Sequence, residues 1–113
     1  MTAVLLATGD VARRKVLGLV GLGARAGTVV VGVDSVRAAA RRGRLALAVV
    51  ASDVSRHSRA KVVPLLVARH VECVEGATGI ELGIAVGRSV TAVVGVVDAA
   101  LARGIRAAAG GRA

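Results

Sequence analysis

The chain has 113 residues, no Phe, Tyr or Trp, and 16 Lys and Arg against seven Asp and Glu, which gives a formal net charge of +9. This length predicts a single domain over residues 1–113 with an aliphatic core. The absence of aromatic rings argues against nucleic-acid binding by base stacking, while the basic charge favours a nucleic-acid partner. The one cysteine, Cys73, excludes an internal disulfide and suits the cytoplasm. We expect no signal peptide, because the first ten residues have no basic n-region and their apolar run is too short. We expect no transmembrane helix, because no stretch of about 20 residues lacks charge.

Strand-like and helix-like patterns alternate along the whole chain. Short apolar or β-branched runs predict strands, and apolar positions at helical spacing predict the helices between them. The run at residues 45–51 shows no alternation, so we expect that strand to be covered on both faces. The expected strands are residues 28–31, 45–51, 70–75 and 90–97, and the expected helices are about residues 11–24, 36–42, 56–69, 79–86 and 99–109. This order predicts an α/β fold with helices on both faces of the sheet.

Short polar side chains precede most of these helices and can accept hydrogen bonds from their first free N–H groups. Thr78 and Glu81 have the spacing of a capping box. Pro64 either kinks its helix or lies in the first turn of a shorter one. The expected N-caps are Asp10, Asp34 or Ser35, and Asp98, and the expected loose ends are residues 1–9 and 108–113.

The segment from Gly32 to Gly43 carries the main functional signal. A helix that starts directly after a glycine presents free N–H groups and a partial positive charge, which together favour an anion. Three arginines, at positions 37, 41 and 42, lie on this helix. Each of them alone also fits a solvated helix face, but seven arginines within the first 44 residues favour a shared patch. With this net charge, the anion we expect is a nucleic-acid backbone.

Two other site patterns are weaker. Residues 21–26 match GxGxxA after an apolar run, as in dinucleotide-binding folds, but the next acid comes too early and the chain is short for such a fold. His70, Glu72 and Cys73 could hold a metal, although Cys73 would face away from the other two and is more simply a core residue. No GxSxG motif is present. We therefore expect no metal, no cofactor and no enzymatic activity.

Four motifs in a fixed order carry a family resemblance. They are Leu17-Gly18-Leu19 with Ala24-Arg25-Ala26-Gly27, then Gly32-Val33-Asp34-Ser35-Val36-Arg37-Ala38-Ala39 ending at Gly43, then LALAVVASDVS, and then Glu81-Leu82-Gly83-Ile84-Ala85-Val86-Gly87-Arg88. Over about residues 10–107, their order and spacing resemble the kink-turn RNA-binding ribosomal-protein family, and most closely its small bacterial YlxQ/YbxF-like branch. The resemblance implies a three-layer α-β-α sandwich with a four-stranded mixed sheet.

The resemblance also implies an RNA site. In the family, the start of the second helix enters the widened groove of a kinked RNA at tandem G·A pairs, and the loop after the LGxAxG motif covers an extruded nucleotide. The helix-start motif is typically Gly-x-Asn-Glu, with a lysine three residues after the Glu. This chain has Asp34, Ser35 and Ala38 at those three places, and Arg37 lies next to the lysine position. The RNA-contacting residues we expect are Gly32, Val33, Asp34, Ser35, Arg37, Arg88, Ser89 and Val90, with Arg25 and Arg41 as basic neighbours.

The function that follows from these patterns is non-catalytic binding of structured, kink-turn-like RNA, free or within the ribosome, in association with translation. We expect the protein to act as a cytoplasmic monomer. The alternative is a protein–protein adaptor that kept the fold and lost specific RNA recognition.

Overall fold

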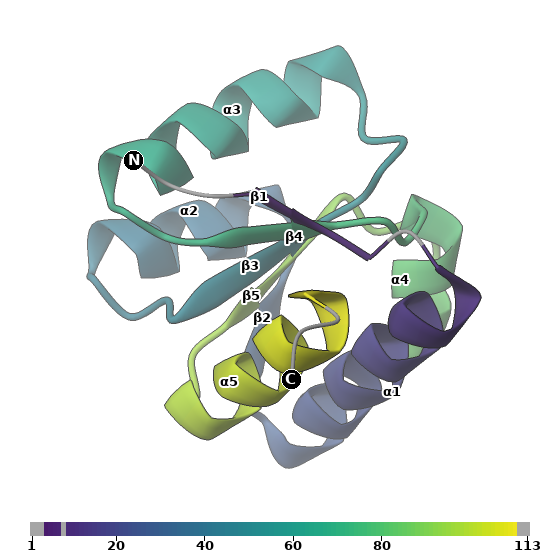
Figure 1. Cartoon of the computed structure of the whole chain (residues 1–113). Helices are drawn as coiled ribbons and strands as arrows, with labels where there is room; N and C mark the ends of the chain where they lie inside the picture. The colour runs from purple at the N-terminus through teal and green to yellow at the C-terminus, as the bar shows by residue number, and fades with distance from the viewer. Residues whose placement is uncertain (1–3, 8, 111–113) are drawn as a thin grey trace.

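The chain folds as three layers, with helices on both faces of one mixed β-sheet (Figure 1). The computed structural model describes residues 4–7 and 9–110. The strands are β1 (Val4–Leu6), β2 (Val29–Val31), β3 (Leu47–Val50), β4 (Cys73–Glu75) and β5 (Val93–Val96), in the order β1-β4-β3-β5-β2 across the sheet. The helices are α1 (Asp10–Ala26), α2 (Val33–Arg41), α3 (Arg56–Ala68), α4 (Gly79–Val86) and α5 (Ala99–Gly110).

The central strand β3 shows how the layers are arranged, because its side chains point alternately to the two faces of the sheet. Leu47 and Val49 pack with side chains of α1, α4 and α5. Ala48 and Val50 pack on the opposite face with side chains of α2 and α3. All four residues of β3 are at most 1% exposed. The prediction that this strand is covered on both faces is therefore confirmed, as is the three-layer α-β-α architecture.

A fifth strand joins the four that the sequence predicted. β1 pairs in parallel with β4, with Leu6 opposite Glu75. Residues 4–6 therefore form an edge of the sheet instead of the loose arm expected there. A run of three residues is too short to show an alternating pattern, so the sequence carried no signal for this strand. Of the other residues expected to be loose, 1–3, 8 and 111–113 lie outside the described residues. Ala7 is buried, Gly9 is the N-cap of α1, and 108–110 belong to α5.

The predicted capping residues act in three different ways. Asp98 accepts a hydrogen bond from the first turn of α5 at 2.8 Å, as expected. Thr78 and Glu81 form the expected capping box at the start of α4. Asp10 is the first residue of α1 and not its N-cap, which is Gly9.

The third helix decides between the two alternatives for Pro64, and the strand after it begins later than the sequence predicts. Pro64 lies inside α3, so the alternative in which it opens a shorter helix is wrong. Proline has no N–H to donate to the carbonyl of Ala60, but Ala60 is exposed, so water can take that place. His70 follows α3 with a left-handed backbone (φ 57°). Because this conformation ends the helix and delays the strand, β4 begins at Cys73 and not at His70.

Two glycines of α1, Gly21 and Gly23, serve close packing. A Cβ on Gly23 would lie 2.5 Å from a Leu101 methyl group of α5 and 2.8 Å from Val29 of β2, and a Cβ on Gly21 would lie 3.3 Å from the Ala85 carbonyl of α4. These contacts let three elements approach the helix, which offsets its low intrinsic propensity at glycine. The GxGxxA pattern is therefore a helix-packing pattern, because the apolar run before the glycines, residues 16–20, belongs to the same helix as the glycines and is not a strand.

We predict that Val49→Asp unfolds the protein or nearly so. The substitution would bury an unpaired carboxylate between two layers, at a cost of several kcal/mol. Thermal melting followed by far-ultraviolet circular dichroism is the measurement. Val11→Asp is the matched control, because Val11 is 64% exposed in the first turn of α1, where a carboxylate is favourable. Melting of Val49→Asp close to that of the parent would contradict the assignment of β3 as the core strand.

Candidate nucleic-acid interface

Four helices begin at the same edge of the sheet (Figure 1). β1, β3 and β4 run parallel, and both β2 and β3 run antiparallel to β5, so β1 to β4 all end at this edge. Since α1 to α4 each follow one of these strands, their N-termini are gathered there. The partial positive charges of these helix N-termini favour the binding of an anion at this edge of the sheet.

The start of α2 is open to solvent. Gly32 is the N-cap, with φ 96° and ψ 162°, and it donates a hydrogen bond to the Val93 carbonyl of β5 at 2.9 Å. Asp34 and Ser35 are exposed residues within the first turn and do not cap the helix, so that prediction is wrong. Among the described residues, the N–H groups of Val33, Asp34 and Ser35 have no hydrogen-bond acceptor. They remain available to a ligand.

The loop between α4 and β5 is folded back over the helix that precedes it. Gly87 ends α4 in the left-handed conformation (φ 75°). The Arg88 N–H then donates to the Gly83 carbonyl at 2.7 Å, and the Thr91 N–H donates to the Gly79 carbonyl at 2.9 Å. A Cβ on Gly83 would overlap the carbonyl of the loop, so glycine is required for this close approach. The glycines of the LGxAxG motif thus allow the loop to pack directly against α4. The side chains of residues 88–90 in this loop are exposed.

Strand pairing brings this loop and the start of α2 to the same place. β2 and β5 are antiparallel, with Val31 opposite Val94, and the Gly32 N–H reaches the next carbonyl of β5, that of Val93. Val90, the last residue of the exposed loop, precedes Val93 by only three positions. The two segments implied by the family resemblance are therefore neighbours at one edge of the sheet.

A pocket that the sequence did not predict lies between the loop and the start of α3, with a volume of about 280 Å³. Two of its polar groups act as caps: Asp53 Oδ1 accepts from the Gly79 N–H of α4 at 2.8 Å, and Ser55 Oγ accepts from the Ser58 N–H of α3 at 3.1 Å. The pocket is lined by Ala51, Asp53, Val54, Ser55, Ser58, Gly79, Val90, Thr91 and Ala92.

The arginines expected at the site lie at different distances from it. Arg88 is exposed in the loop, and no partner for its side chain occurs within the described residues. Arg37 donates a hydrogen bond from Nη1 to the Lys61 carbonyl of α3 at 2.6 Å, so it joins the two helices on that face. Arg41 lies in the last turn of α2, about 13 Å along the helix from Gly32.

The remaining expected arginine, Arg25, lies beside α4. Its guanidinium is close to Gly21, and Gly21 is the residue that packs against the Ala85 carbonyl. Arg25, in the last turn of α1, therefore lies beside α4, the helix that precedes the exposed loop.

The model of the ribosomal protein L7Ae/L30e/S12e/Gadd45 family matches residues 14–103. The chain belongs to this family. A solved protein of unknown function from Bacillus halodurans C is 30% identical with a TM-score of 0.78, and the match covers 83% of this chain and 95% of that one. The 15.5kD RNA binding protein of Giardia lamblia is 21% identical with a TM-score of 0.78 over 92% of this chain and 89% of that one, which shows the same fold. No curated protein sequence matches the chain.

Within this L7Ae-family fold, the acidic side chains serve almost entirely as internal partners. Arg13 pairs with Asp10 at 2.5 Å and with Glu81 at 3.3 Å, and two further ion pairs join arginines of α3 and α5 to acids in or next to β4. Asp53 and Asp98 cap helices. Asp34 is the remaining acid, and the described residues provide no partner for it. A single free carboxylate therefore lies at the exposed start of α2.

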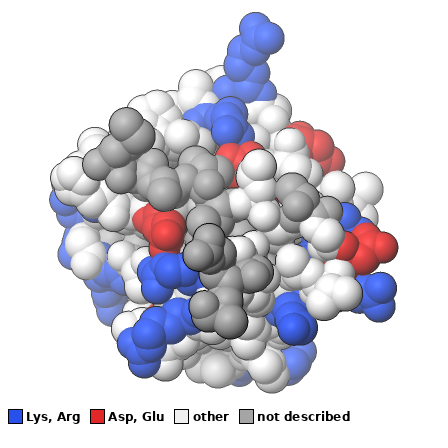
Figure 2. Space-filling model, in the orientation of Figure 1, with Lys and Arg blue, Asp and Glu red and all other residues white. Residues whose placement is uncertain are grey.

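On the face of the molecule drawn in Figure 2, the basic side chains do not form one continuous patch. Figure 2 shows one face of the molecule, where Lys and Arg side chains lie in several separate groups and acidic side chains are fewer. The candidate interface is therefore defined by backbone geometry, through the open helix start and the folded loop, and the general positive charge adds to it.

The cysteine belongs to the core, and the two acids near it pair with arginines. Cys73 is 2% exposed, and burial together with the negative charge of Glu75 raises the pKa of its thiol to about 11. Glu72 is paired with Arg106. In the part of the chain that the structure describes, no three His, Cys, Asp or Glu side chains are placed to hold a metal ion, and no helix is long and apolar enough to cross a membrane.

We predict opposite effects for alanine at two glycines of this fold. Gly83→Ala should destabilise the protein by about 1–3 kcal/mol, because the new Cβ must displace the loop backbone. Gly18→Ala should stabilise it by up to about 1 kcal/mol, because a Cβ there meets nothing within 4 Å and alanine favours the helix. Denaturant unfolding measures both changes. A neutral Gly83→Ala with unchanged amide shifts at residues 88–91 would contradict the account of the loop.

Proposed function

We propose that the protein binds structured RNA through the edge of the sheet where the start of α2 meets the loop of residues 87–91. The observation that carries this proposal is the juxtaposition itself: free helix N–H groups and an exposed arginine-bearing loop share one edge, joined by the Gly32–Val93 hydrogen bond. The contact residues we propose are Gly32, Val33, Asp34, Ser35, Arg88, Ser89 and Val90, with Arg25, Arg37 and Arg41 as basic neighbours.

The start of α2 would contact the RNA in two ways. Its free N–H groups can donate to phosphate oxygens, aided by the helix dipole and by the absence of a side chain at Gly32. The Asp34 carboxylate has no competing partner among the described residues, and it can only accept hydrogen bonds. It would therefore select base amino groups such as those of adenine, cytosine or guanine. Arg37 supports this surface by fixing α2 to α3.

The pocket beside Val90 would bind one nucleotide that is extruded from the base stack of the RNA. Its volume of about 280 Å³ lies just below the roughly 300–1,000 Å³ of clefts for drug-sized ligands, which suits a single base. Val90 is 70% exposed, and it can cover the base by apolar contact, since the chain has no aromatic ring to stack on it. Ser55 and Ser58 can hydrogen-bond the base edge or the sugar. This arrangement favours RNA that is kinked with an extruded nucleotide over a plain duplex.

The family and one solved neighbour support this proposal. The family is one of ribosomal proteins, and the Giardia lamblia neighbour is an RNA binding protein. We propose accordingly that the protein acts without catalysis, as a monomer, in association with ribosomal or other structured RNA of the translation machinery in the cytoplasm. The adaptor alternative rests on Ser35 and Ala38, which cannot make the contacts of the typical family motif, and on Arg37, which is engaged with α3.

We predict that Arg88→Ala weakens binding to a kinked RNA with one extruded nucleotide by about 1–3 kcal/mol. Arg103→Ala is the control, because Arg103 is also exposed but lies in α5, which starts at the opposite edge of the sheet. Fluorescence anisotropy with labelled RNA, compared with a plain duplex of equal length, measures both. Affinity should also fall with salt at a log–log slope of roughly −3 to −5 if about four to six phosphates are contacted.

Equal losses for Arg88→Ala and Arg103→Ala, without preference for the kinked RNA, would mean that a diffuse basic surface binds and that the proposed site is wrong. No RNA binding at low salt would favour the adaptor.

A further inference from the structure

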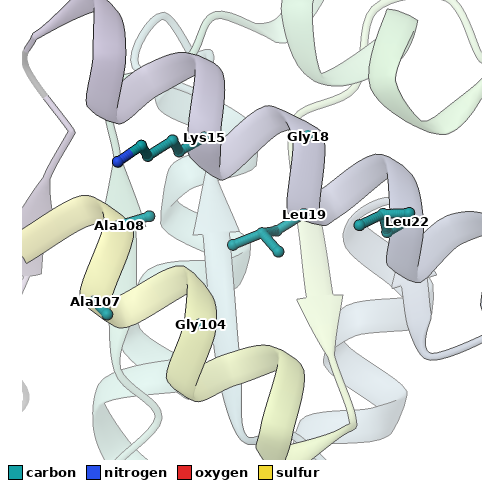
Figure 3. A pocket seen from close by; sticks show the side chains of 7 residues that line it. All are labelled: Lys15, Gly18, Leu19, Leu22, Gly104, Ala107 and Ala108. Carbon is teal, nitrogen blue, oxygen red and sulfur yellow. The ribbon is translucent and has the colours of Figure 1, made fainter.

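An open apolar groove runs between α1 and α5 on the face of the sheet that these helices cover (Figure 3). Its volume is about 570 Å³. Every lining residue except Lys15 is glycine, alanine or leucine, and in Figure 3 Leu19 points from α1 toward α5. The groove is lined by Lys15, Gly18, Leu19, Leu22, Gly104, Ala107 and Ala108.

Small residues on both helices create the depth of this groove. A Cβ on Gly18 would meet nothing within 4 Å, and a Cβ on Gly104 would first meet Leu19, at 3.6 Å. Neither glycine is therefore needed for packing within the molecule, unlike Gly21 and Gly23 on the same helix. Both glycines cost helix stability without a compensating internal contact.

The apolar surface continues along α1 beyond the groove. Val11, Lys15, Gly18 and Leu22 follow one another at spacings of four, three and four residues, which places them on one stripe of the helix. Val11 is 64% exposed and Leu22 is 54% exposed. The stripe is about 16 Å long, or three helical turns.

Two parallel ridges with an apolar floor between them have the shape that accepts a third helix. The floor offers a phosphate no donor other than Lys15, so the groove is a poor site for a nucleic-acid backbone. Its flanks are basic, since Lys15 in the groove, Arg14 on α1 and Arg103 on α5 are exposed and have no carboxylate partner among the described residues. Asp10, the one acid of α1, is paired with Arg13, and α5 has no acid.

We propose that this groove binds an acidic amphipathic helix of a partner protein. Leucine-like side chains at i, i+3 or i+4, and i+7 would lie between Leu19, Leu22 and the small residues of α5, and carboxylates on the flanks would face Lys15, Arg14 and Arg103. A second copy of this chain is a poor occupant, because each copy carries a net charge of +9. The groove shares no residue with the proposed RNA surface, so the two ligands can bind together.

The experiment uses a synthetic 18-residue peptide with leucines and one tryptophan on one helical face and glutamates on both flanks. Because the 113-residue chain has no Trp, Tyr or Phe, the fluorescence of the peptide reports its own burial without background. We expect saturable binding with a blue shift of the tryptophan emission. A scrambled peptide of the same composition is the peptide control.

Two variants of the protein test the groove, and each has a matched control on α3, which covers the other face of the sheet. Gly18→Leu fills the groove while favouring the helix, and it should weaken peptide binding at least about tenfold, whereas Ala60→Leu should not. Lys15→Glu should also weaken binding about tenfold, whereas Lys61→Glu, at the other exposed lysine of the chain, should change it little.

Several outcomes would overturn the proposal. They are the absence of a blue shift up to about 1 mM peptide, equal binding to Gly18→Leu and the parent, and equal effects of Lys15→Glu and Lys61→Glu. If the parent binds a plain RNA duplex and Gly18→Leu does not, the groove would be assigned to nucleic acid instead. If sedimentation shows that the parent is a dimer and that Gly18→Leu is a monomer, the groove would be assigned to a second copy of the chain.

Discussion

The direction of β5 is the constraint on which the rest of the structure depends. β5 lies between β3 and β2 and is antiparallel to both, whereas the other four strands share one direction. Its first residues are therefore at the edge where the other strands end and where four helices begin. If β5 ran parallel to its neighbours, the loop before it would lie at the opposite edge, away from the start of α2. The proposed RNA surface exists because one strand is reversed.

Glycine then determines the detailed shape of that edge, through three separate effects. Gly32 adopts a positive φ angle and leaves the first turn of α2 uncovered. Gly87 ends α4 in a left-handed conformation, and Gly83 lets the loop lie directly on the helix. None of these residues has a side chain with which to contact RNA, so their contribution is to the position of the groups that we propose to contact it. The acids support the same edge from inside, as helix caps and ion-pair partners.

The order of elements could be predicted from the sequence because each long element has a strong local pattern. The unbroken run around β3, the capping box of Thr78 and Glu81, and the cap at Asp98 depend on nearby residues only, and the structure confirms them. The motif order was sufficient to indicate the family.

Non-local features could not be predicted in this way. β1 is too short to show a pattern and forms only because β4 offers a free edge. The hydrogen bond of Arg37 to α3 and the place of Asp53 across from Gly79 depend on how distant segments pack. The same holds for Gly18, which resembles the other glycines of α1 in the sequence but faces an open groove.

The central claim is that two segments more than 50 residues apart form one RNA surface. Amide chemical-shift mapping of the ¹⁵N-labelled protein, titrated with an RNA that carries a sharp kink and one extruded nucleotide, tests it most directly. The account predicts that shifts concentrate in residues 32–37, 53–58 and 88–92, and that a plain duplex produces smaller shifts there. Shifts spread over all the arginine-bearing helices, or confined to α1 and α5, would contradict it.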